Sequence, residues 1–413
     1  MVKVFTYSKD EEKEALEYLK HNDPLERELF QDLEVLGYSG DDLAKIVLYV
    51  AVTSRKLDKP LSVLSVANSS AGKSFGQEVI SSLVPDDELF SYTRLSPRSL
   101  SHFGKYDLQN KALFLDEFVG SEDESSSQLR SLLSRGHITT GYSTMDSMTG
   151  KVQTINKDVF GPIALLSSAT NENRIDDETR SRFMILPVDE SQEQTARVMA
   201  SMIERNTERG VLSQGQRDKI RRKYQMFQKV LRPVTVVLPD PWANKIQFNS
   251  ERISQKRRFQ GYLSFLYAVA LHRQFQKDVK VLMTPSNEKV EVIVVDRRDI
   301  LLTNSVMSRL YGAGSQDLNP VNRKMLLDIQ AFCDVQGKQA GIPPGEITFT
   351  RRDIRESGRW DAVPCRRAFE KLLELEYIEK SFGHKRARHF YRLAPGNSPG
   401  NSGDSGSALW CPE

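Results

Sequence analysis

One short stretch of the sequence has the residue types and spacing of a phosphate-binding loop. Residues 67–74 read Ala-Asn-Ser-Ser-Ala-Gly-Lys-Ser, with Ala67 where the usual pattern has its first glycine. In such a loop the backbone N–H groups face the phosphates, the lysine neutralises the β- and γ-phosphates, and the serine binds Mg²⁺. The candidate nucleotide-binding residues are Asn68, Ser69, Ser70, Ala71, Gly72, Lys73 and Ser74.

An acidic pair ends the next candidate strand. The apolar run 111–115 leads directly into Asp116 and Glu117. We expect Asp116 to hold the Mg²⁺ through its coordinated water and Glu117 to polarise the water that attacks the γ-phosphate. An apolar strand that ends in Asp-Glu is common by itself. Because this acidic pair lies downstream of the candidate loop, the two together favour a nucleotide-hydrolysing site over a simple strand–turn–helix junction.

Asn171 and one of two nearby arginines could complete the same catalytic site. Asn171 follows the third apolar run, where its amide could bind the attacking water or the γ-phosphate; as an alternative, it caps a helix or turn. Arg180 and Arg182 precede the fourth run, and Arg182 is the better candidate to stabilise transition-state charge on a neighbouring subunit. The alternative for this arginine is a solvated helix end.

The elements that must position these residues follow from the hydrophobic pattern. Apolar runs alternate with helical stretches, which predicts an α/β fold with a parallel sheet. Residues 138–155 break this alternation: they are rich in Thr, Ser and Tyr around the turn signal 146–150, which predicts an inserted β-hairpin. The four apolar runs are 61–67, 111–115, 162–169 and 183–188.

The segments before and after the sheet are predicted to be mainly helical. Leucines recur at helical spacing across 24–36, and a helix over 41–57 is expected to have one apolar face. Strands at 279–283 and 290–295 are expected to pair. The predicted domains are an N-terminal helical region at 1–58, a P-loop ATPase core at 59–190 with the hairpin 138–155, a helical lid and connecting region at 191–318, a winged helix-turn-helix at 319–394 and a disordered tail at 395–413.

The C-terminal module has the pattern of a DNA-binding domain. A helix from Asn322, a short strand at 347–350, a helix capped by Thr350, a helix over 362–375 and a hairpin form the predicted winged helix. Val363, Ala368, Leu372 and Leu375 are expected to face inward. An alternative use for such a module is protein contact. The candidate DNA-binding residues are Arg366, Arg367 and Lys371 on the helix and Lys385, Arg386 and Arg388 in the turn.

Taken together, the loop, the acidic pair, Thr170-Asn171 and Ser181-Arg182-Phe183 resemble the motifs of AAA+ ATPases. The resemblance implies that Asn171 acts as sensor 1 and Arg182 as an arginine finger. The hairpin is similar in position to the pre-sensor-1 hairpin of minichromosome-maintenance helicases and their viral relatives. This implies a hexameric ring whose pore hairpins touch DNA, with Lys151 near the tip binding phosphate; the alternative is an exposed hairpin with an incidental lysine.

A closer resemblance is to the helicase half of primase-helicases from phages and mobile elements, over roughly residues 61–393. It implies that Arg258, or its neighbour Arg257, contacts the γ-phosphate from the lid; the alternative is a basic helix start. The zinc-ligand cysteines and the primase of those proteins are not found here, so a separate primase is an expected partner. The matching stretches are 95–100, 161–166, 188–191, 193–195, 257–259 and 272–276.

Composition restricts the remaining function classes. The net charge is only +3, so binding to nucleic acid requires local basic patches. Cys333, Cys365 and Cys411 lack metal-ligand spacing, and no apolar run is long enough to span a membrane, which predicts a cytoplasmic protein.

The favoured function is an ATP-dependent, Mg²⁺-dependent DNA helicase or translocase in phage or mobile-element replication. One alternative is a non-translocating AAA+ ATPase, such as a helicase loader, replication initiator or transposition regulator. Another is a DNA-binding regulator with a decayed loop, which is disfavoured because Lys73, Ser74, Asp116 and Glu117 are all present.

Overall fold

The computed structural model describes most of the chain, and its described residues fall into two compact units. The first unit contains the described residues up to 243 and those of 260–306; the second contains 255–259 and those from 307 onward. The described ranges are 7–66, 73–96, 99–118, 124–145, 152–169, 181–243, 255–311, 320–374, 377–381 and 389–394.

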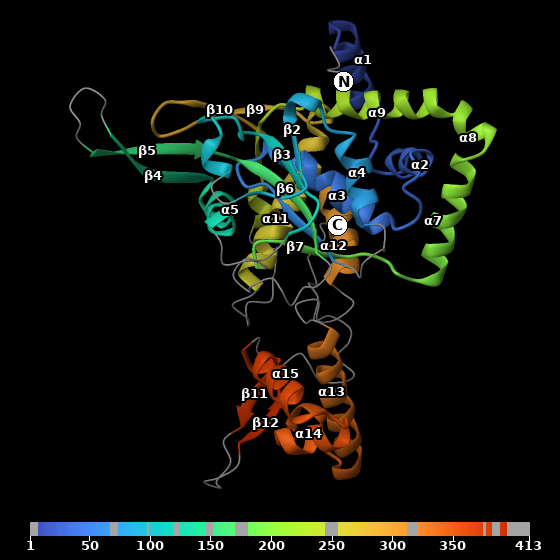
Figure 1. Cartoon of the computed structure of the whole chain (residues 1–413), viewed down its shortest axis with the longest axis vertical. Helices are drawn as coiled ribbons and strands as arrows, with labels where there is room; N and C mark the ends of the chain where they lie inside the picture. The colour runs from blue at the N-terminus through green and yellow to red at the C-terminus, as the bar shows by residue number, and fades with distance from the viewer. Residues whose placement is uncertain are drawn as a thin grey trace. The chain divides into compact units, whose positions relative to one another are not determined.

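A parallel sheet forms the centre of the first unit (Figure 1). Within the described residues its five strands are ordered β2-β3-β6-β1-β7, and every neighbouring pair is parallel. The four predicted apolar runs are all strands of this sheet, so the predicted α/β fold is confirmed. The strands are β1 (Ser62–Val66), β2 (Leu89–Tyr92), β3 (Lys111–Leu115), β6 (Ile163–Ala169) and β7 (Met184–Pro187).

Helices α3 (Asp42–Thr53) and α4 (Lys73–Ser81) pack beside this sheet, and α5 (Glu124–Arg135) adds Leu129 and Leu132 to the same core. The predicted helix after Asp41 is confirmed: its apolar residues Ile46, Val47 and Val50 are buried, as is every other residue of α3 from Ala44 to Thr53. This helix contacts β1, β6 and β7 of the sheet and also α2 and α4. A helix covered by packing partners has no solvent face to keep polar.

The remaining helices of the first unit surround this core. Helix α1 (Lys9–His21) packs along α9 (Gln214–Val230), where Arg222 forms an ion pair with Glu11. Strands β9 and β10 pair antiparallel as predicted, and β8 adds to β10 in parallel. The other elements are α2 (Glu28–Val35), α7 (Gln192–Arg205), α8 (Glu208–Leu212), α10 (Asp240–Ala243), α11 (Gln255–His272), α12 (Arg297–Tyr311), β8 (Thr235–Val237), β9 (Lys280–Met283) and β10 (Lys289–Val294).

The inserted hairpin is confirmed and is longer than predicted. Strand β4 (His137–Met145) pairs antiparallel with β5 (Val152–Phe160), and among the described residues these strands pair only with each other. Ile138 and Val159 are buried where the hairpin joins the body, and its outer part projects away from the sheet (Figure 1). Lys151 lies outside the described residues.

The second unit contains α13 (Pro320–Ala340), α14 (Arg351–Ser357), α15 (Ala362–Glu374), β11 (Ile378–Ser381) and β12 (Phe390–Leu393). Strands β11 and β12 pair antiparallel, and the predicted strand at 347–350 is reduced to one bridge, from Phe349 to Tyr391. Thr350 caps α14 as predicted, in a reciprocal capping box with Asp353.

One predicted core position of α15 was wrong. Val363 is 54% exposed, whereas Ala368 and Leu372 are buried as predicted; Leu375 lies outside the described residues. The buried stripe of α15 is Cys365, Ala368, Phe369 and Leu372, at spacings of three and four residues. Val363 falls off that stripe. No described helix in either unit is long and apolar enough to cross a membrane.

Candidate nucleotide-binding site

The strand preceding the candidate phosphate loop and the strand preceding the acidic pair end at the same edge of the sheet. Val66 of β1 lies level with Ala169 of β6, and Leu115 of β3 lies level with Ser167 of β6. Parallel strands direct their carboxyl ends to one edge, so the loop and Asp116 both leave the sheet there. Only β6 separates β1 from β3, which places the two exits roughly 10 Å apart, or two strand spacings.

The backbone of the acidic pair is held on both sides. The Asp116 N–H donates to the Tyr92 carbonyl oxygen at 3.1 Å, and the Phe118 N–H donates to the Ser168 carbonyl oxygen at 2.8 Å. Phe118 then returns to the core, where its ring meets Phe183 edge-on at 5.3 Å. The side chains of Asp116 and Glu117 are exposed at the edge. Two carboxylates therefore face solvent from a fixed backbone, an arrangement that suits an Mg²⁺–nucleotide complex.

Two serines of β6 reinforce this arrangement, although they belong to none of the predicted motifs. The Ser167 Oγ donates to the Leu115 carbonyl oxygen at 2.8 Å, and the Ser168 Oγ donates to the Asp116 carbonyl oxygen. Both side chains are buried in an otherwise apolar strand. A buried hydroxyl requires a hydrogen-bond partner, so the Ser-Ser pair in the third apolar run was the signal available in the sequence.

The helix that follows the loop is fixed near its start. Helix α4 begins at Lys73, and its third and fourth residues contact other elements of the first unit. The Arg205 guanidinium lies over the Phe75 ring, 4.8 Å from its centroid. A Cβ added at Gly76 would lie 2.7 Å from Cζ of Tyr38, so the tyrosine approaches as closely as a glycine permits. The unexpected glycine within a helix was the sequence signal for this contact.

Several predicted site residues lie outside the described residues. They are Asn68 to Gly72 of the loop, Asn171 and Arg180, and the side chains of Lys73, Ser74 and Arg257. Arg258 is half-buried in the part of α11 that belongs to the second unit.

Arg182 is described, and it lies at the opposite edge of the sheet. It precedes the amino end of β7, whereas the loop leaves from the carboxyl end of the adjacent β1. Its Nε atom donates to the Ser134 Oγ at 2.6 Å, at the end of α5. The strand alone spans roughly 10 Å. Arg182 is therefore separated from the sheet edge at which the loop and Asp116 leave β1 and β3.

The predicted DNA-binding cations of the second unit are only partly described. Arg366 and Arg367 are exposed on α15, and Lys371 is half-buried. The Arg366 Nε lies 3.9 Å from a carboxylate oxygen of Glu370, one helical turn away. Lys385, Arg386 and Arg388 lie outside the described residues.

Comparison with known proteins assigns the first unit to a family. No curated protein matches the chain. The family described as the MTBMA_p00010 P-loop domain matches residues 8–233, which is more than half of the chain. The matched range includes the loop, the acidic pair and Arg182, and a P-loop binds nucleoside triphosphates, usually with Mg²⁺. The chain therefore belongs to the MTBMA_p00010 P-loop domain family.

Proposed function

We propose that the protein is an ATP-dependent DNA helicase or translocase of the AAA+ type, acting in the replication of a phage or mobile element. The observation that carries the proposal is the shared sheet edge of the loop after β1 and the acidic pair after β3, with the end of β6 between them. One site can then hold the triphosphate, its metal and the attacking water.

Each residue has a distinct role at this edge. Lys73 neutralises the β- and γ-phosphates, and Ser74 and Asp116 hold the Mg²⁺, which withdraws charge from the phosphates when bound. Glu117 accepts a hydrogen bond from the attacking water and so orients that water. Asn171 follows the carboxyl end of β6, between the loop and the acidic pair, and is the proposed second contact to that water. ATP and Mg²⁺ are the proposed cofactors.

The position of Arg182 supports an assembly of several subunits. An arginine at the opposite sheet edge from its own loop cannot stabilise the γ-phosphate bound there, but it can serve a neighbouring copy. We therefore propose a ring, most simply a hexamer, in which Arg182 completes the next subunit's site. Arg258 is the proposed contact from the lid.

The projecting hairpin and the second unit are the proposed DNA contacts. A ribbon of two strands is marginal by itself, so a long projecting one is better explained by a binding role than by stability. Lys151 at its turn is the proposed phosphate contact. The order helix, bridge, helix, helix and hairpin in the second unit supports a winged helix that binds DNA through α15 and its turn.

Unwinding of a forked duplex tests this function. The full chain with ATP should separate the strands, whereas the Glu117→Gln variant should bind ATP and DNA without separating them. Strand separation that is equal without ATP would overturn the proposal. DNA-stimulated ATP hydrolysis without any unwinding would instead indicate a non-translocating loader, initiator or transposition regulator. Addition of a separate primase would test coupling to primer synthesis.

A further inference from the structure

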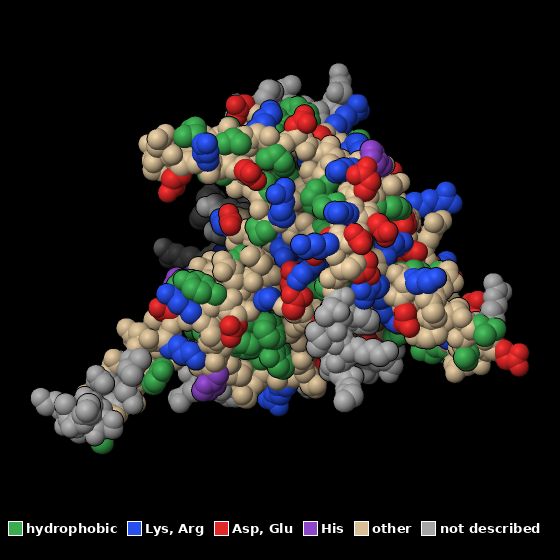
Figure 2. Space-filling model, turned by 90° about the horizontal axis from the view of Figure 1, so that it is seen from above, with side chains coloured by type: hydrophobic (Ala, Val, Ile, Leu, Met, Phe, Trp, Pro, Cys, Tyr) green, Lys and Arg blue, Asp and Glu red, His purple; other side chains and the backbone are tan. Residues whose placement is uncertain are grey.

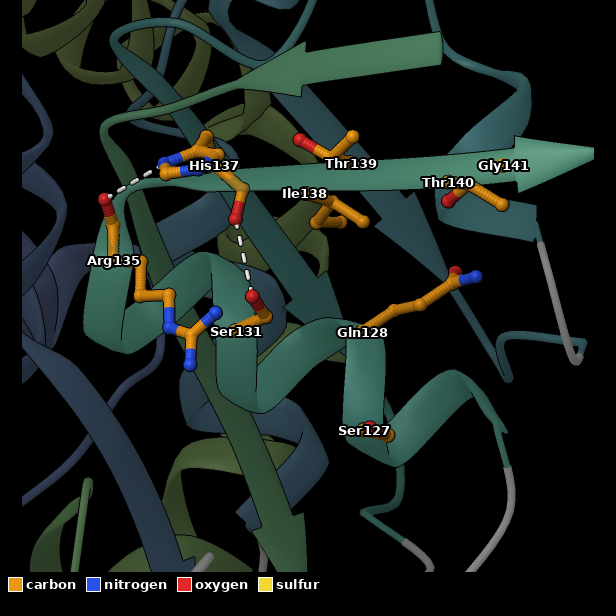
Figure 3. A pocket seen from close by; sticks show the side chains of 9 residues that line it. All are labelled: Ser127, Gln128, Ser131, Arg135, His137, Ile138, Thr139, Thr140 and Gly141. Atoms are coloured by element: carbon orange, nitrogen blue, oxygen red, sulfur yellow. Dashed lines mark hydrogen bonds between the residues drawn. The ribbon is translucent and has the colours of Figure 1, made fainter. Parts of the chain in front are cut away.

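A polar cavity of about 380 Å³ lies between α5 and β4, where the projecting hairpin joins the body (Figure 3). Helix α5 contributes Ser127, Gln128 and Arg135, and β4 contributes Thr140 and Gly141. Helix α5 starts beyond the carboxyl end of β3 and returns to the amino side of the sheet, where β6 begins. The Arg135 end of the cavity therefore lies at the amino side of the sheet, away from the edge that carries the candidate nucleotide site.

The wall of this cavity has a fixed geometry. The Ser131 Oγ donates to the His137 carbonyl oxygen at 3.2 Å, and the His137 Nδ1 lies 3.2 Å from the Arg135 carbonyl oxygen. Figure 3 shows both interactions as links between the end of α5 and the start of β4. The helix and the strand are thus joined at one end of the cavity.

Gln128 lines this cavity and carries a buried acceptor without a described partner. Its side chain is only 8% exposed, and its Oε1 has no hydrogen-bond partner among the described residues. A buried acceptor without a partner costs free energy, so the site favours a ligand that brings an N–H donor. In Figure 3 this side chain extends toward Thr140, at the end of the cavity away from Arg135.

Arg135 supplies a positive charge at the other end of the cavity. Its side chain is exposed, and no ion pair joins it to another described residue. A guanidinium with free donors at the mouth of a polar cavity favours a phosphate. The cavity thus offers an acceptor at one end and a cation at the other, and a nucleotide carries the matching base N–H donors and phosphate.

The same face of the hairpin continues this surface outward. Lys157 lies opposite Thr140 in the ribbon, and Tyr142, two residues along β4 from Thr140, is 48% exposed. Residues two apart in a strand share a face, so Thr140, Lys157 and Tyr142 follow one another away from the cavity. A cation and an aromatic ring in succession suit the backbone and the bases of a single strand.

We propose that this cavity binds one nucleotide of a single-stranded nucleic acid, with Gln128 accepting from the base and Arg135 contacting the phosphate. The inference rests on the proposed function, since it requires that the hairpin contact nucleic acid. It adds a base-contacting position at the foot of the hairpin to the phosphate contact proposed at the hairpin turn.

Binding of two labelled oligonucleotides by the full chain tests the proposal. One is a 20-nucleotide oligodeoxycytidylate and the other an abasic strand of equal length, each measured by fluorescence anisotropy with a non-hydrolysable ATP analogue. Gln128→Ala should weaken binding of the first strand about tenfold and leave the abasic strand unchanged, because only the first offers base donors. Arg135→Ala should weaken both, and should lower the salt slope by about 0.7.

Arg197→Ala is the matched control, because it removes one exposed cation from α7, on the far side of the first unit from the hairpin (Figure 1). It should leave both affinities unchanged. Wild-type affinities retained in the Gln128→Ala and Arg135→Ala variants would overturn this inference alone, whereas a wild-type chain that binds neither strand would overturn the proposed function as well. If the circular dichroism spectrum shows that Gln128→Ala does not fold, the test passes to Arg135→Ala, because Arg135 is exposed. An equal loss of affinity in Arg135→Ala and Arg197→Ala would then overturn the site.

Discussion

The guanidinium of Arg182 is hydrogen-bonded to the Ser134 hydroxyl, with 2.6 Å between Nε and Oγ. This contact joins the segment before β7 to the end of α5, and three residues after Ser134 the chain enters the hairpin at His137. An arginine that senses a neighbour's γ-phosphate would therefore be attached to the same helix end that carries the proposed DNA-contacting ribbon. In the proposed ring, this link would provide a physical route between hydrolysis in one subunit and the position of the hairpin in the next.

The first prediction concerns action between subunits. Arg182→Ala and Lys73→Ala should each lower ATP hydrolysis by about 10³-fold or more, because one removes the cation that stabilises the transition state and the other the phosphate contact. A mixture of the two inactive variants should recover part of the activity, since some interfaces combine an intact loop with an intact arginine. The measurement is phosphate release per subunit at a series of mixing ratios.

Arg197→Ala provides the control for loss of a positive charge. Its mixture with Lys73→Ala should show only the activity expected from the subunits whose loops are intact. If Arg182→Ala hydrolyses ATP at the wild-type rate, the arginine has no role in the neighbour's site.

The second prediction separates binding from hydrolysis at the acidic pair. Glu117→Gln keeps the shape of the side chain and removes its charge, so ATP binding should be unchanged while hydrolysis falls by about 10²- to 10⁴-fold. Equilibrium binding of a fluorescent ATP analogue and steady-state phosphate release measure the two effects. Glu14→Gln, an exposed carboxylate on α1, is the matched control. Equal hydrolysis in both variants would exclude Glu117 from the reaction.

Much of this site could be predicted because its information is local. A strand such as Lys111–Leu115 is recognised from a continuous apolar run, and the acidic pair follows it in the sequence. The hairpin was recognisable from its turn residues and its β-favouring composition. The edge strand β2 was missed because Leu89–Tyr92 is short and no residue of it is fully buried, so its pattern is weak.

What could not be predicted depends on contacts between distant segments. The order of the strands, and hence the placement of β6 between β1 and β3, is set by pairing that no local pattern specifies. The partnership of Arg182 with Ser134 and the unused acceptor of Gln128 follow from that order, because it determines which helix lies beside which loop. The Val363 error arose from an apolar residue outside the helical stripe.

The third prediction tests the close approach of Tyr38 to α4. Gly76→Ala should lower the free energy of unfolding by about 1–3 kcal/mol, because the added methyl group would overlap the tyrosine ring. Chemical denaturation measures this change. Gly215→Ala is the matched control: an added Cβ there meets nothing within 4 Å, so the free energy should stay unchanged or rise by up to about 1 kcal/mol. A Gly76→Ala variant that shows no loss, like the Gly215→Ala control, would indicate that the ring yields without cost.

The last prediction concerns pH. His272 is buried beside Tyr49, with 3.3 Å between Nε2 and the phenol oxygen, and burial lowers its pKa to about 4; Asp23 opposes this shift and Arg273 adds to it. The unfolded chain, with an ordinary histidine pKa near 6.5, binds the proton more readily between pH 6.5 and 4. The contribution of His272 to the free energy of unfolding is therefore fully present above pH 6.5, and it should fall by roughly 3 kcal/mol as the pH approaches 4. Denaturation at several pH values should show this slope in the wild type and a flatter one in His272→Gln, whatever the variant's stability at neutral pH; identical slopes would mean that the histidine takes up its proton in the folded protein.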